Sequence, residues 1–476
     1  MSSSTPVRNP RTGEFDFEID PFGRDDVERE AAHVRANQPA WADDLNLRIA
    51  TLEEWKAEIV KARADIAEAL TLDTGRRALS YAEVDVITGA IDRWCRLAPE
   101  LLQPPQPRKS EIPGIELAWT TSPYPVVAVI SPWNFPLILT LIDAVPALAA
   151  GCAVMAKASK VTPRFVEPLA ETIARVPELD KVFRMIRGTG SIGSVMIDYA
   201  DAVCFTGSIP VGRIVAHAAA ERLIPAFLEL GGKDAAIVTA DADLERATTA
   251  LLRASVANTG QACQSIERIY VQRPVFDDFV AKLVEKAKAA ELNYPDIDSG
   301  QIGPLIAAEQ ADIVRDHVAD AVAKGAVVHC GGEIESHGGG AWCRPTVLTN
   351  VSHEMECLRE ETFGPLLPVM PFDTIDEAVA LANDSNCGLS GAVIAGSRAE
   401  AEAIGRRMEA GAISLQDAGM TSFVHDAEKD SCKESGIGMS RMGASGLLRF
   451  LRQRALICNT GDAWPLAMFQ EGSQKL

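Results

Sequence analysis

The sequence predicts an α/β fold with two doubly wound domains and a small β excursion outside them. Its 476 residues exceed the roughly 100–200 residues of an ordinary domain, so two or three domains are expected. Short apolar segments alternate with helical segments over most of the chain. Such alternation is typical of parallel strands covered by helices on both faces of a sheet.

The N-terminal part is expected to be helical up to a proline-rich break. Residues 41–100 predict helices, with amphipathic stretches at 52–69 and 82–97. The run Gln-Pro-Pro-Gln-Pro at 103–107 ends this region, and residues 115–125 then predict a short extended excursion.

The alternation begins directly after this excursion. Strands are expected at residues 126–130, 152–155, 182–186, 202–205 and 226–230, with helices at 137–149, 164–174 and 211–220. Gly231 and Gly232 mark a seam, after which a second alternation starts. It predicts strands at 235–238, 268–271 and 326–329, and helices at 244–256 and 275–290. The cleft between the two domains is the expected place for a ligand.

Composition excludes several classes of partner. A formal charge of −20 repels nucleic acid and anionic membranes, so neither is expected to bind. Residues 1–8 contain no apolar core of a secretory signal, and the apolar stretch 126–150 is interrupted by Pro, Asn and Asp. The ten cysteines include no Cys-x-x-Cys pair, so we expect no metal site and reduced thiols in a cytoplasm.

Three segments together suggest acyl chemistry. Cys263 follows a loop with a flexible glycine, where a thiol can face a cleft as a nucleophile. Glu229 ends an apolar strand before two glycines, where burial suits a carboxylate to general-base work. Asn134 lies in a strand-to-helix turn and can donate an N–H to a developing oxyanion. Each residue alone also has a purely structural explanation, but together they supply nucleophile, base and oxyanion donor.

Two segments have the pattern of phosphate-binding turns. Residues 188–193 spell Gly-x-Gly-x-x-Gly after an apolar strand, but no acidic residue follows about 20 positions later to hold a ribose. The run Phe-Thr-Gly-Ser at 205–208 ends a strand and opens a helix, which places Ser208 beside free N–H groups. We favour the second segment as the pyrophosphate site; a tight βα turn without a ligand is the alternative for both.

Five motifs, in order along the chain, resemble those of the aldehyde dehydrogenase superfamily. They are Pro-Trp-Asn-Phe-Pro at 132–136, Phe-Thr-Gly-Ser at 205–208, Glu-Leu-Gly-Gly-Lys at 229–233, Gly-Gln-Ala-Cys at 260–263 and Glu-Thr-Phe-Gly-Pro at 361–365. The resemblance covers nearly the whole chain. It implies oxidation of an aldehyde to a carboxylic acid with NAD or NADP, through a thiohemiacetal and a thioester on Cys263.

The resemblance also implies roles for individual residues. Glu229 would be the base, and Asn134 with the backbone N–H of Cys263 would form the oxyanion hole. Lys157 would hold the adenosine ribose, Ser208 the pyrophosphate and Glu361 the nicotinamide ribose, with Phe363 packing beside it. The remaining expected cofactor-binding residues are Trp133, Lys160, Gly190, Thr206, Gly207 and Leu230.

The domain boundaries are also implied by the resemblance. Residues 1–104 and 124–231 would bind the cofactor, and residues 232–430 would form the catalytic domain. Residues 431–459 would return to the cofactor side. Segments 105–123 and 460–476 would join a neighbouring subunit in a homodimer or homotetramer.

Two departures from the family pattern affect specificity. Lys160 stands where relatives commonly carry a glutamate that binds the adenosine ribose, so NADP should be usable unless this lysine points to solvent. Lys429 stands where an aromatic residue often lines the substrate tunnel. Substrates known for other members of the family therefore cannot simply be transferred to this chain.

The expected substrate pocket is apolar, and two other activities stay open. Phe135, Leu139, Ile142 and Phe423 are the candidate lining residues, which favours an aromatic or medium-sized apolar aldehyde; packing in the core is the alternative for Leu139 and Ile142. A CoA-acylating aldehyde dehydrogenase would lack a glutamate at position 229. A cysteine hydrolase without a redox role would leave the motifs at 205–208 and 361–365 unexplained.

Overall fold

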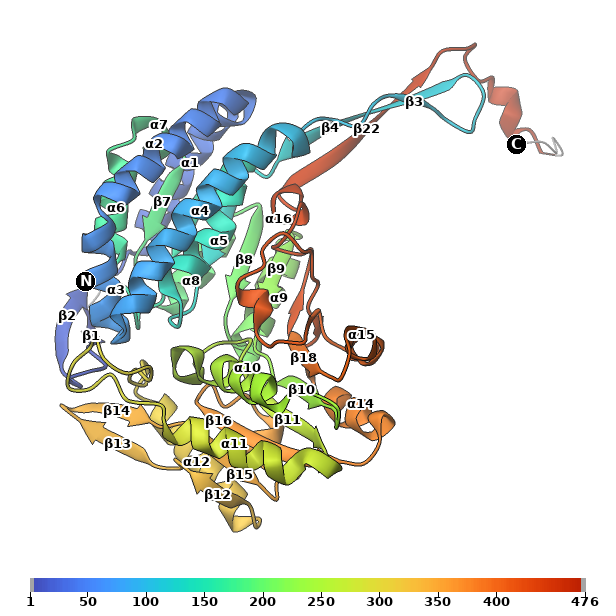
Figure 1. Ribbon diagram of the computed structural model, residues 1–476. Coiled ribbons are helices and arrows are strands. Elements are labelled where there is room, and N and C mark those ends of the chain that lie inside the picture. Colours follow the sequence, from blue (N-terminus) through green and yellow to red (C-terminus); the bar gives the residue numbers. More distant parts are fainter. Residues whose placement is uncertain (1–3, 472–476) are drawn as a thin grey trace.

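The computed structural model describes residues 4–471 and contains two α/β domains and a projecting arm (Figure 1). This architecture confirms the predicted fold class. Among the described residues, no helix combines the length and the hydropathy that are needed to cross a membrane.

The first sheet has six strands in the order β21-β9-β8-β5-β6-β7. The parallel strands are β5 (Val126–Ile130), β6 (Ala153–Lys157), β7 (Phe183–Ile186), β8 (Ala202–Thr206) and β9 (Ala226–Glu229). The short strand β21 (Gly436–Ile437) joins antiparallel to β9. After β7 the chain returns to the other side of β5, so the strand order reverses between β5 and β8. Doubly wound sheets bind their ligands at the carboxyl end of such a switch point.

Helices cover both faces of this sheet. Those that connect its strands are α5 (Pro136–Ala150), α6 (Val166–Ala174), α7 (Pro177–Asp180), α8 (Gly190–Asp198) and α9 (Ile209–Glu221). Four N-terminal helices add to them: α1 (Arg24–Asp43), α2 (Leu45–Lys61), α3 (Arg63–Thr74) and α4 (Arg77–Leu101). Helix α1 precedes the stretch that we expected to be helical, and its largely polar sequence buries only five positions. It packs against β6 and α8, whereas α4 packs against α5.

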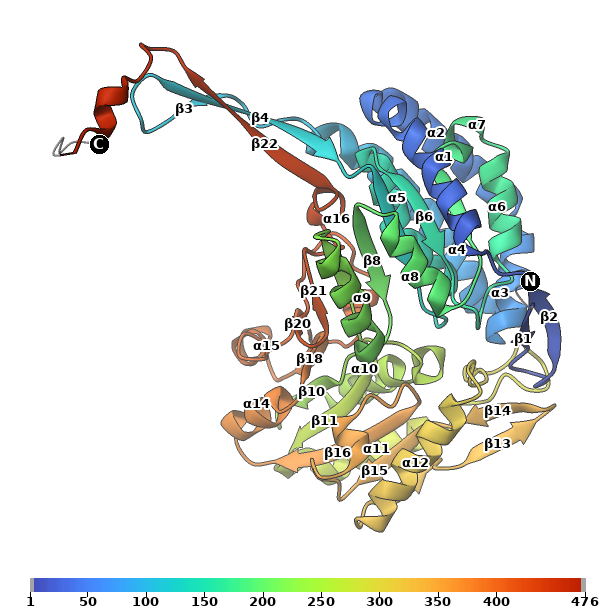
Figure 2. The same cartoon turned by 180° about the vertical axis from the view of Figure 1, so that it is seen from behind.

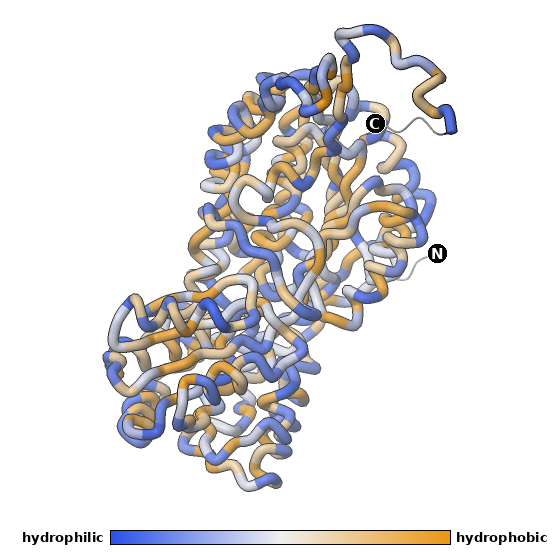
Figure 3. The backbone as a smooth tube through the Cα atoms, turned by 90° about the vertical axis from the view of Figure 1, so that its right-hand side faces the viewer, coloured by the Kyte–Doolittle hydropathy of each residue, from blue (hydrophilic) through white to orange (hydrophobic). Residues whose placement is uncertain are grey.

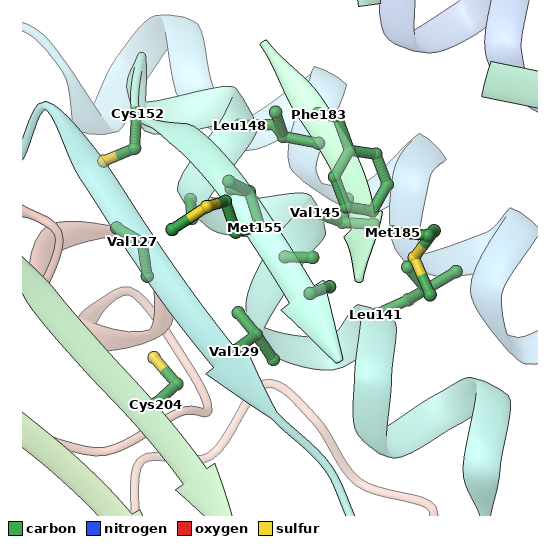
Figure 4. Close-up of a cluster of buried hydrophobic side chains, with 14 of the residues drawn as sticks. Val127, Val129, Leu141, Val145, Leu148, Cys152, Met155, Phe183, Met185 and Cys204 are labelled. Carbon is green, nitrogen blue, oxygen red and sulfur yellow. The ribbon is translucent and has the colours of Figure 1, made fainter. Parts of the chain in front are cut away.

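Complete burial explains the apolar runs of the first sheet. All five residues of β5 are buried, and Figure 4 shows Val127 and Val129 of this strand among side chains from α5 and the neighbouring strands. Helix α5 starts with Pro136, whose fixed φ suits a first helical turn, and ends before Gly151 at φ 102°. The predicted strand and helix at 126–149 therefore form the centre of the domain.

The second domain contains a seven-stranded sheet in the order β12-β15-β16-β11-β10-β18-β19. Its strands are β10 (Asp234–Val238), β11 (Ile266–Gln272), β12 (Val327–Cys330), β15 (Thr346–Thr349), β16 (Leu366–Phe372), β18 (Ser390–Ile394) and β19 (Ala412–Leu415). Only β12 runs antiparallel to its neighbour. The helices beside it are α10 (Leu244–Val256), α11 (Phe276–Lys288), α12 (Gln310–Ala323), α14 (Ile375–Asn383) and α15 (Arg398–Gly405). This domain has hydrophobic clusters separate from those of the first.

A long two-stranded arm leaves the first domain (Figures 1 and 2). It pairs β4 (Ile115–Pro123) with β22 (Leu451–Asn459) over nine residues, and the short β3 (Arg108–Lys109) adds to its far end. The second strand of the arm, 451–459, belongs to the segment that we expected to return to the cofactor side, and it leads directly into the segment 460–476. At the base of the arm the N–H of Tyr124 donates to the carbonyl of Phe450, next to the first paired residues of the two strands.

The chain beyond β22 contains a short helical turn, η4 (Leu466–Phe469). Figure 3 shows this terminal segment standing apart from the two domains, with hydrophobic and hydrophilic stretches alternating along the tube. Residues 472–476 of the expected oligomerisation segment lie outside the described residues.

Arg164 ties the N-terminal hairpin of β1 (Thr5–Arg8) and β2 (Phe15–Ile19) to the first domain. Its Nε and backbone N–H donate to the carboxylate of Asp73, each at 2.7 Å, and its Nη2 donates to Asp16. The Asp73 side chain is fully buried and that of Arg164 nearly so. The buried carboxylate of Asp73 is stable as a charge only while the guanidinium of Arg164 is present.

Replacing Arg164 should destabilise the fold strongly. In Arg164→Met the carboxylate of Asp73 stays buried without its cation, and the free energy of unfolding should fall by about 3–5 kcal/mol. Urea unfolding measures this loss. The control is Arg175→Met, which removes an exposed pair with Glu171 and should change stability by less than about 1 kcal/mol. Equal losses in both variants would contradict this assignment.

Candidate active site

Two sheet edges face each other across the domain boundary. The carboxyl ends of β5, β8 and β9 present Asn134, Gly207 and Glu229, while the loops before β11 and β16 present Cys263 and Glu361. A cavity of about 240 Å³ lies between these edges. Its lining residues are Pro132, Trp133, Asn134, Leu139, Thr206, Gly207, Ser208, Leu230, Gly231, Cys263, Gln310, Ile313, Glu361 and Phe363.

The loop before Cys263 has an unusual backbone. Asn258, Thr259 and Gly260 have φ values of 54°, 59° and 74°, so three consecutive residues are left-handed. For a residue with a side chain this conformation costs about 1–2 kcal/mol. A Cβ on Gly260 would lie 2.3 Å from the backbone of Gly364, so only glycine fits there. The loop before Cys263 is thus strained and depends on its surroundings to keep this backbone.

Hydrogen bonds from Gln261 hold this strained loop in place. Its side-chain Nε2 donates to the carbonyls of Asn258 (3.0 Å) and Pro304 (3.2 Å), and its Oε1 accepts from the N–H of Ile306 at 2.8 Å. The Thr259 hydroxyl donates to the carbonyl of Gly303 at 3.0 Å. Because these acceptors belong to the second domain, the loop is fixed to that domain.

Asn134 connects the two domains at the same place. Its side-chain Nδ2 donates to the backbone carbonyl of Gln261 at 3.0 Å, and the backbone carbonyl of Asn134 accepts from Asn258 Nδ2 at 2.9 Å. A carboxamide has two N–H donors, and the bond to Gln261 uses one of them. Asn134 and Cys263 both line the cavity.

A buried ion pair supports the turn that carries Asn134. Arg76 donates to the carbonyl of Asn134, and Glu83 Oε1 lies 3.2 Å from the Arg76 guanidinium. The other oxygen of Glu83 accepts the N–H groups of Leu137 and Ile138 in the first turn of α5. Burial raises the pKa of Glu83 to about 7, and Arg76 opposes this rise. Sequence analysis did not identify this pair, because neither residue belongs to one of the motifs.

Cys263 is partly exposed at the cavity. Its desolvated surroundings raise the pKa of the thiol to about 12. Since the thiolate is the nucleophile, the thiol needs a base or a nearby cation before it can attack.

Glu229 lies beside two cations rather than on the cavity wall. The Ser431 hydroxyl donates to its Oε2 at 3.1 Å. Lys429 Nζ lies 3.9 Å from the same oxygen, and Arg441 Nε lies 3.7 Å from Oε1. The carboxylate of Glu229 thus lies at the edge of the site, next to one hydroxyl and two buried cations.

Glu361 and Phe363 project from a loop that a buried salt bridge fixes. Glu267 accepts the N–H groups of Thr362 (2.8 Å) and Phe363 (2.9 Å) and pairs with Lys233. Phe363 has a φ of 53° and packs edge-on against Trp133 at 5.4 Å. Burial, followed by the charge of Glu267, raises the pKa of Glu361 to about 8.

The glycines at the domain seam allow a close approach. A Cβ on Gly231 would lie 2.6 Å from Glu361 Oε2, and the N–H of Gly232 donates to Glu361 Oε1 at 3.1 Å. The seam predicted at these two residues is therefore also one wall of the cavity.

The expected dinucleotide residues follow the carboxyl ends of β6, β7 and β8. Lys157 ends β6, and its buried Nζ donates to the carbonyls of Ala158 (2.9 Å) and Gly188 (3.2 Å). Burial and, second, the charge of Lys160 lower the pKa of Lys157 to about 8. Gly190 starts α8 and Ser208 precedes α9, where its side chain makes no capping bond. Lys157, Lys160 and Gly190 do not line the cavity at Cys263.

The four expected substrate-pocket residues lie in different surroundings. Leu139 lines the cavity, and Ile142 is buried one turn further along α5. Phe135 packs under the guanidinium of Arg76, 4.6 Å from the ring centre. Phe423 is 68% exposed, lies near Arg253 and does not line the cavity. The hydroxyls of Thr421 and Ser422, just before Phe423, bond the side chain of Gln264, so this loop lies next to the Cys263 loop while the Phe423 ring itself is exposed.

Two lining residues were missed by sequence analysis. Gln310 and Ile313 come from α12, and Gln310 donates to the carbonyl of Thr362. They lie about 50 positions before Glu361 in the chain and form no motif. Only the packing of α12 beside the loop of Glu361 brings them to the site.

Comparisons with known proteins define the class to which this fold and cavity belong. Residues 1–456 match the model of the aldehyde dehydrogenase family. The chain therefore belongs to the aldehyde dehydrogenase family. It is an NAD(P)-dependent aldehyde dehydrogenase that oxidises an aldehyde to a carboxylic acid.

Individual relatives are similar over nearly their whole length. A candidate aldehyde dehydrogenase of Anabaena variabilis has a TM-score of 0.96 and 50% identity, with coverage of 98% of this chain and 100% of that one. A betaine aldehyde dehydrogenase of Staphylococcus aureus, solved with NAD+, has a TM-score of 0.91 and 30% identity. The match covers 98% of this chain and 94% of that protein. A candidate succinate-semialdehyde dehydrogenase [NADP(+)] of Mycolicibacterium smegmatis is 36% identical. The match covers 95% of this chain and 88% of that protein.

Gly260→Ala should disrupt the Cys263 loop. The added Cβ meets the backbone of Gly364, and the left-handed φ strains any residue with a side chain. We expect a loss of about 2–6 kcal/mol in unfolding free energy, with a fall in dehydrogenase activity. Thermal unfolding and the initial rate of NAD(P)H formation measure the two effects.

The matched control is Gly89→Ala. Gly89 lies inside α4 with open space around the added Cβ, so the change should stabilise by about 0.5–1 kcal/mol. A Gly260→Ala enzyme with the parent's stability and rate would show that the loop does not need this backbone.

Proposed function

We propose that Cys263 is the nucleophile, Glu229 the base, and Asn134 with the backbone N–H of Cys263 the oxyanion hole. The observation that carries this proposal is the side chain of Asn134, which is bonded to the Cys263 loop and lines the same cavity as Cys263. Attack of Sγ on the aldehyde carbon gives a tetrahedral thiohemiacetal, whose oxyanion these donors stabilise. Oxidation leaves a thioester, which water cleaves to the acid.

The structure has features that fit a nicotinamide dinucleotide. The reversal of strand order between β5 and β8 ends at the N-terminus of α9, where the Ser208 side chain makes no capping bond. Helix N-termini bind phosphate through their free N–H groups. Lys157 and Lys160 would face the adenosine ribose, Glu361 the other ribose, and Phe363 would pack beside the ring. When bound, the cofactor supplies the hydride acceptor.

Glu229 favours release of a free acid over transfer to CoA. Its carboxylate is present and held by Ser431, Lys429 and Arg441, so a base for activating water lies beside the site. A CoA-acylating enzyme has to avoid this hydrolysis. A cysteine hydrolase would need neither the switch-point cavity nor Glu361.

We propose a medium-sized apolar aldehyde as the substrate. Trp133, Leu139, Ile313 and Phe363 supply apolar surface at the cavity. The alternative is a short aldehyde with a carboxylate, since a relative is named for succinate semialdehyde and buried cations lie near Glu229. Specificity constants for both kinds of aldehyde distinguish these candidates.

We further propose that the arm joins a second copy of the chain in a cytoplasmic homodimer or homotetramer. Few side chains of β22 are covered, and Ile457, Leu466 and Phe469 are 71%, 84% and 75% exposed. An apolar surface of this kind on a projecting arm is typical of an interface. Sedimentation of the full-length protein tests the assembly.

Cys263→Ser should abolish turnover and leave cofactor binding nearly unchanged. A hydroxyl is a much poorer nucleophile than a thiol at neutral pH, so less than about one hundredth of the rate should remain. Nicotinamide absorbance measures turnover, and calorimetric titration measures cofactor binding. Cys458→Ser, at an exposed thiol of the arm, is the control and should keep the parent rate. Substantial turnover by Cys263→Ser would refute the covalent route.

Lys160→Glu should shift cofactor preference toward NAD. A contact between an ammonium group and the 2′-phosphate is worth about 1.5–3 kcal/mol, so the ratio of kcat/KM for NADP to that for NAD should fall at least about tenfold. Lys181→Glu, at an exposed lysine paired with Glu178, is the control. An unchanged ratio in Lys160→Glu would place this lysine away from the ribose.

A further inference from the structure

A buried cluster of five charged groups lies behind Glu229. The three cations are Lys429, Arg441 and Arg449, and the two carboxylates are Glu229 and Asp143. The side chain of Glu229 is 13% exposed, and the other four are at most 6% exposed. The cluster therefore carries one positive charge more than its carboxylates neutralise.

Asp143 takes up most of the arginine charge. Arg441 Nη2 lies 3.1 Å from one of its oxygens, and Arg449 bonds the other. The same Nη2 of Arg441 donates to the Thr206 hydroxyl at 2.6 Å. Only Arg441 Nε is left toward Glu229, at 3.7 Å, where it makes no hydrogen bond.

Lys429 has no such partner of its own. Its backbone N–H donates to Ser440 Oγ at 3.0 Å, which fixes the chain at this residue. Its Nζ makes no hydrogen bond among the described residues, and its one ion-pair contact there is Glu229 Oε2 at 3.9 Å. A buried ammonium group is retained only where negative charge balances it. The carboxylates that can balance Lys429 are Glu229, 3.9 Å away, and the buried Asp234, whose raised pKa the charge of Lys429 lowers in part.

The thiol of Cys263 also interacts with this charge. Burial raises the pKa of Cys263, and the carboxylates of Glu361, Asp234 and Glu229 raise it further. Lys429 acts in the opposite direction and is the strongest of the charged groups in its effect on this thiol. Lys429 therefore lies 3.9 Å from Glu229 and its charge also acts on the thiol of Cys263.

We propose that Lys429 is the counter-ion shared by Glu229 and the Cys263 thiolate, and hence a positioning residue for nucleophile activation. The proton leaves Sγ and binds a carboxylate oxygen of Glu229, so the negative charge moves from oxygen to sulfur. Lys429 balances the charge before and after this transfer. The proposal rests on the proposed roles of Cys263 and Glu229.

The direct test is the reactivity of Cys263 without substrate. Alkylation by iodoacetamide is followed on the Cys263 peptide by mass spectrometry between pH 7 and 9, in the parent and in Lys429→Met. At a pH below its pKa the thiol is alkylated in proportion to its thiolate fraction. Each unit by which the pKa of Cys263 rises therefore lowers the alkylation rate tenfold. Higher nucleophilicity offsets part of that loss, which leaves at least about a threefold fall per unit. We expect at least this fall in Lys429→Met.

Conservative and distant variants separate charge from folding. Lys429→Arg keeps the cation and should react within about twofold of the parent, whereas Lys429→Gln should resemble Lys429→Met. Lys282→Met removes an exposed lysine and should leave the rate unchanged. If Lys429→Met does not fold, Lys429→Gln gives the same measurement.

Steady-state kinetics supply a second readout. The pH profile of kcat should change in Lys429→Met and stay that of the parent in Lys429→Arg, whereas a purely structural role would leave its shape unchanged in both. Unchanged alkylation with only a higher KM for carboxylate-bearing aldehydes would instead make Lys429 a substrate-binding residue and overturn the proposal. Failure of the proposed function itself would appear separately, as turnover by Cys263→Ser.

Discussion

The reciprocal hydrogen bonds between Asn134 and the 258–261 loop are the constraint on which the rest of the site depends. The donor of Asn134 lies on the first domain and Cys263 on the second, so their relative position is set by how the domains dock. Because Asn134 both donates to Gln261 and accepts from Asn258, a shift of either domain breaks two bonds at once. The left-handed residues 258–260 keep their strained backbone only within this arrangement.

The same loop shows how buried polar groups maintain a reactive geometry. Gln261, Glu83 and Glu267 each satisfy backbone groups close to a proposed site residue. The backbone groups are those of 258, 304 and 306 for Gln261, of 137–138 for Glu83 and of 362–363 for Glu267. None of the three contributes a reacting atom in the proposed mechanism. They fix the loops and the first turn of α5 that carry the site, because an unsatisfied buried donor or acceptor costs about 1–3 kcal/mol.

Much of the fold was predictable, because the strands that form the two sheets are continuous apolar runs with few competing interpretations. The strand at 126–130 and the helix after it match the structure closely, since complete burial leaves a strong sequence signal. The arm was less predictable, because β22 is exposed and its pairing depends on a partner over 300 residues earlier. Contacts from α12, the outward position of Phe423 and the pair of Arg76 with Glu83 depend on tertiary packing alone. Lys429 was visible as a departure from the family pattern, but its neighbours were not.

The desolvated thiol has a consequence for the enzyme between turnovers. Burial raises the pKa of the Cys263 thiol, which lowers the fraction of thiolate at neutral pH. Peroxide attacks the thiolate form, and the resulting sulfinic and sulfonic acids are not readily reversed. The surroundings that raise the pKa of Cys263 therefore also lower the reactivity of this thiol toward peroxide while no substrate is bound. Low reactivity toward oxidants and the need for an activating group would then have the same physical origin.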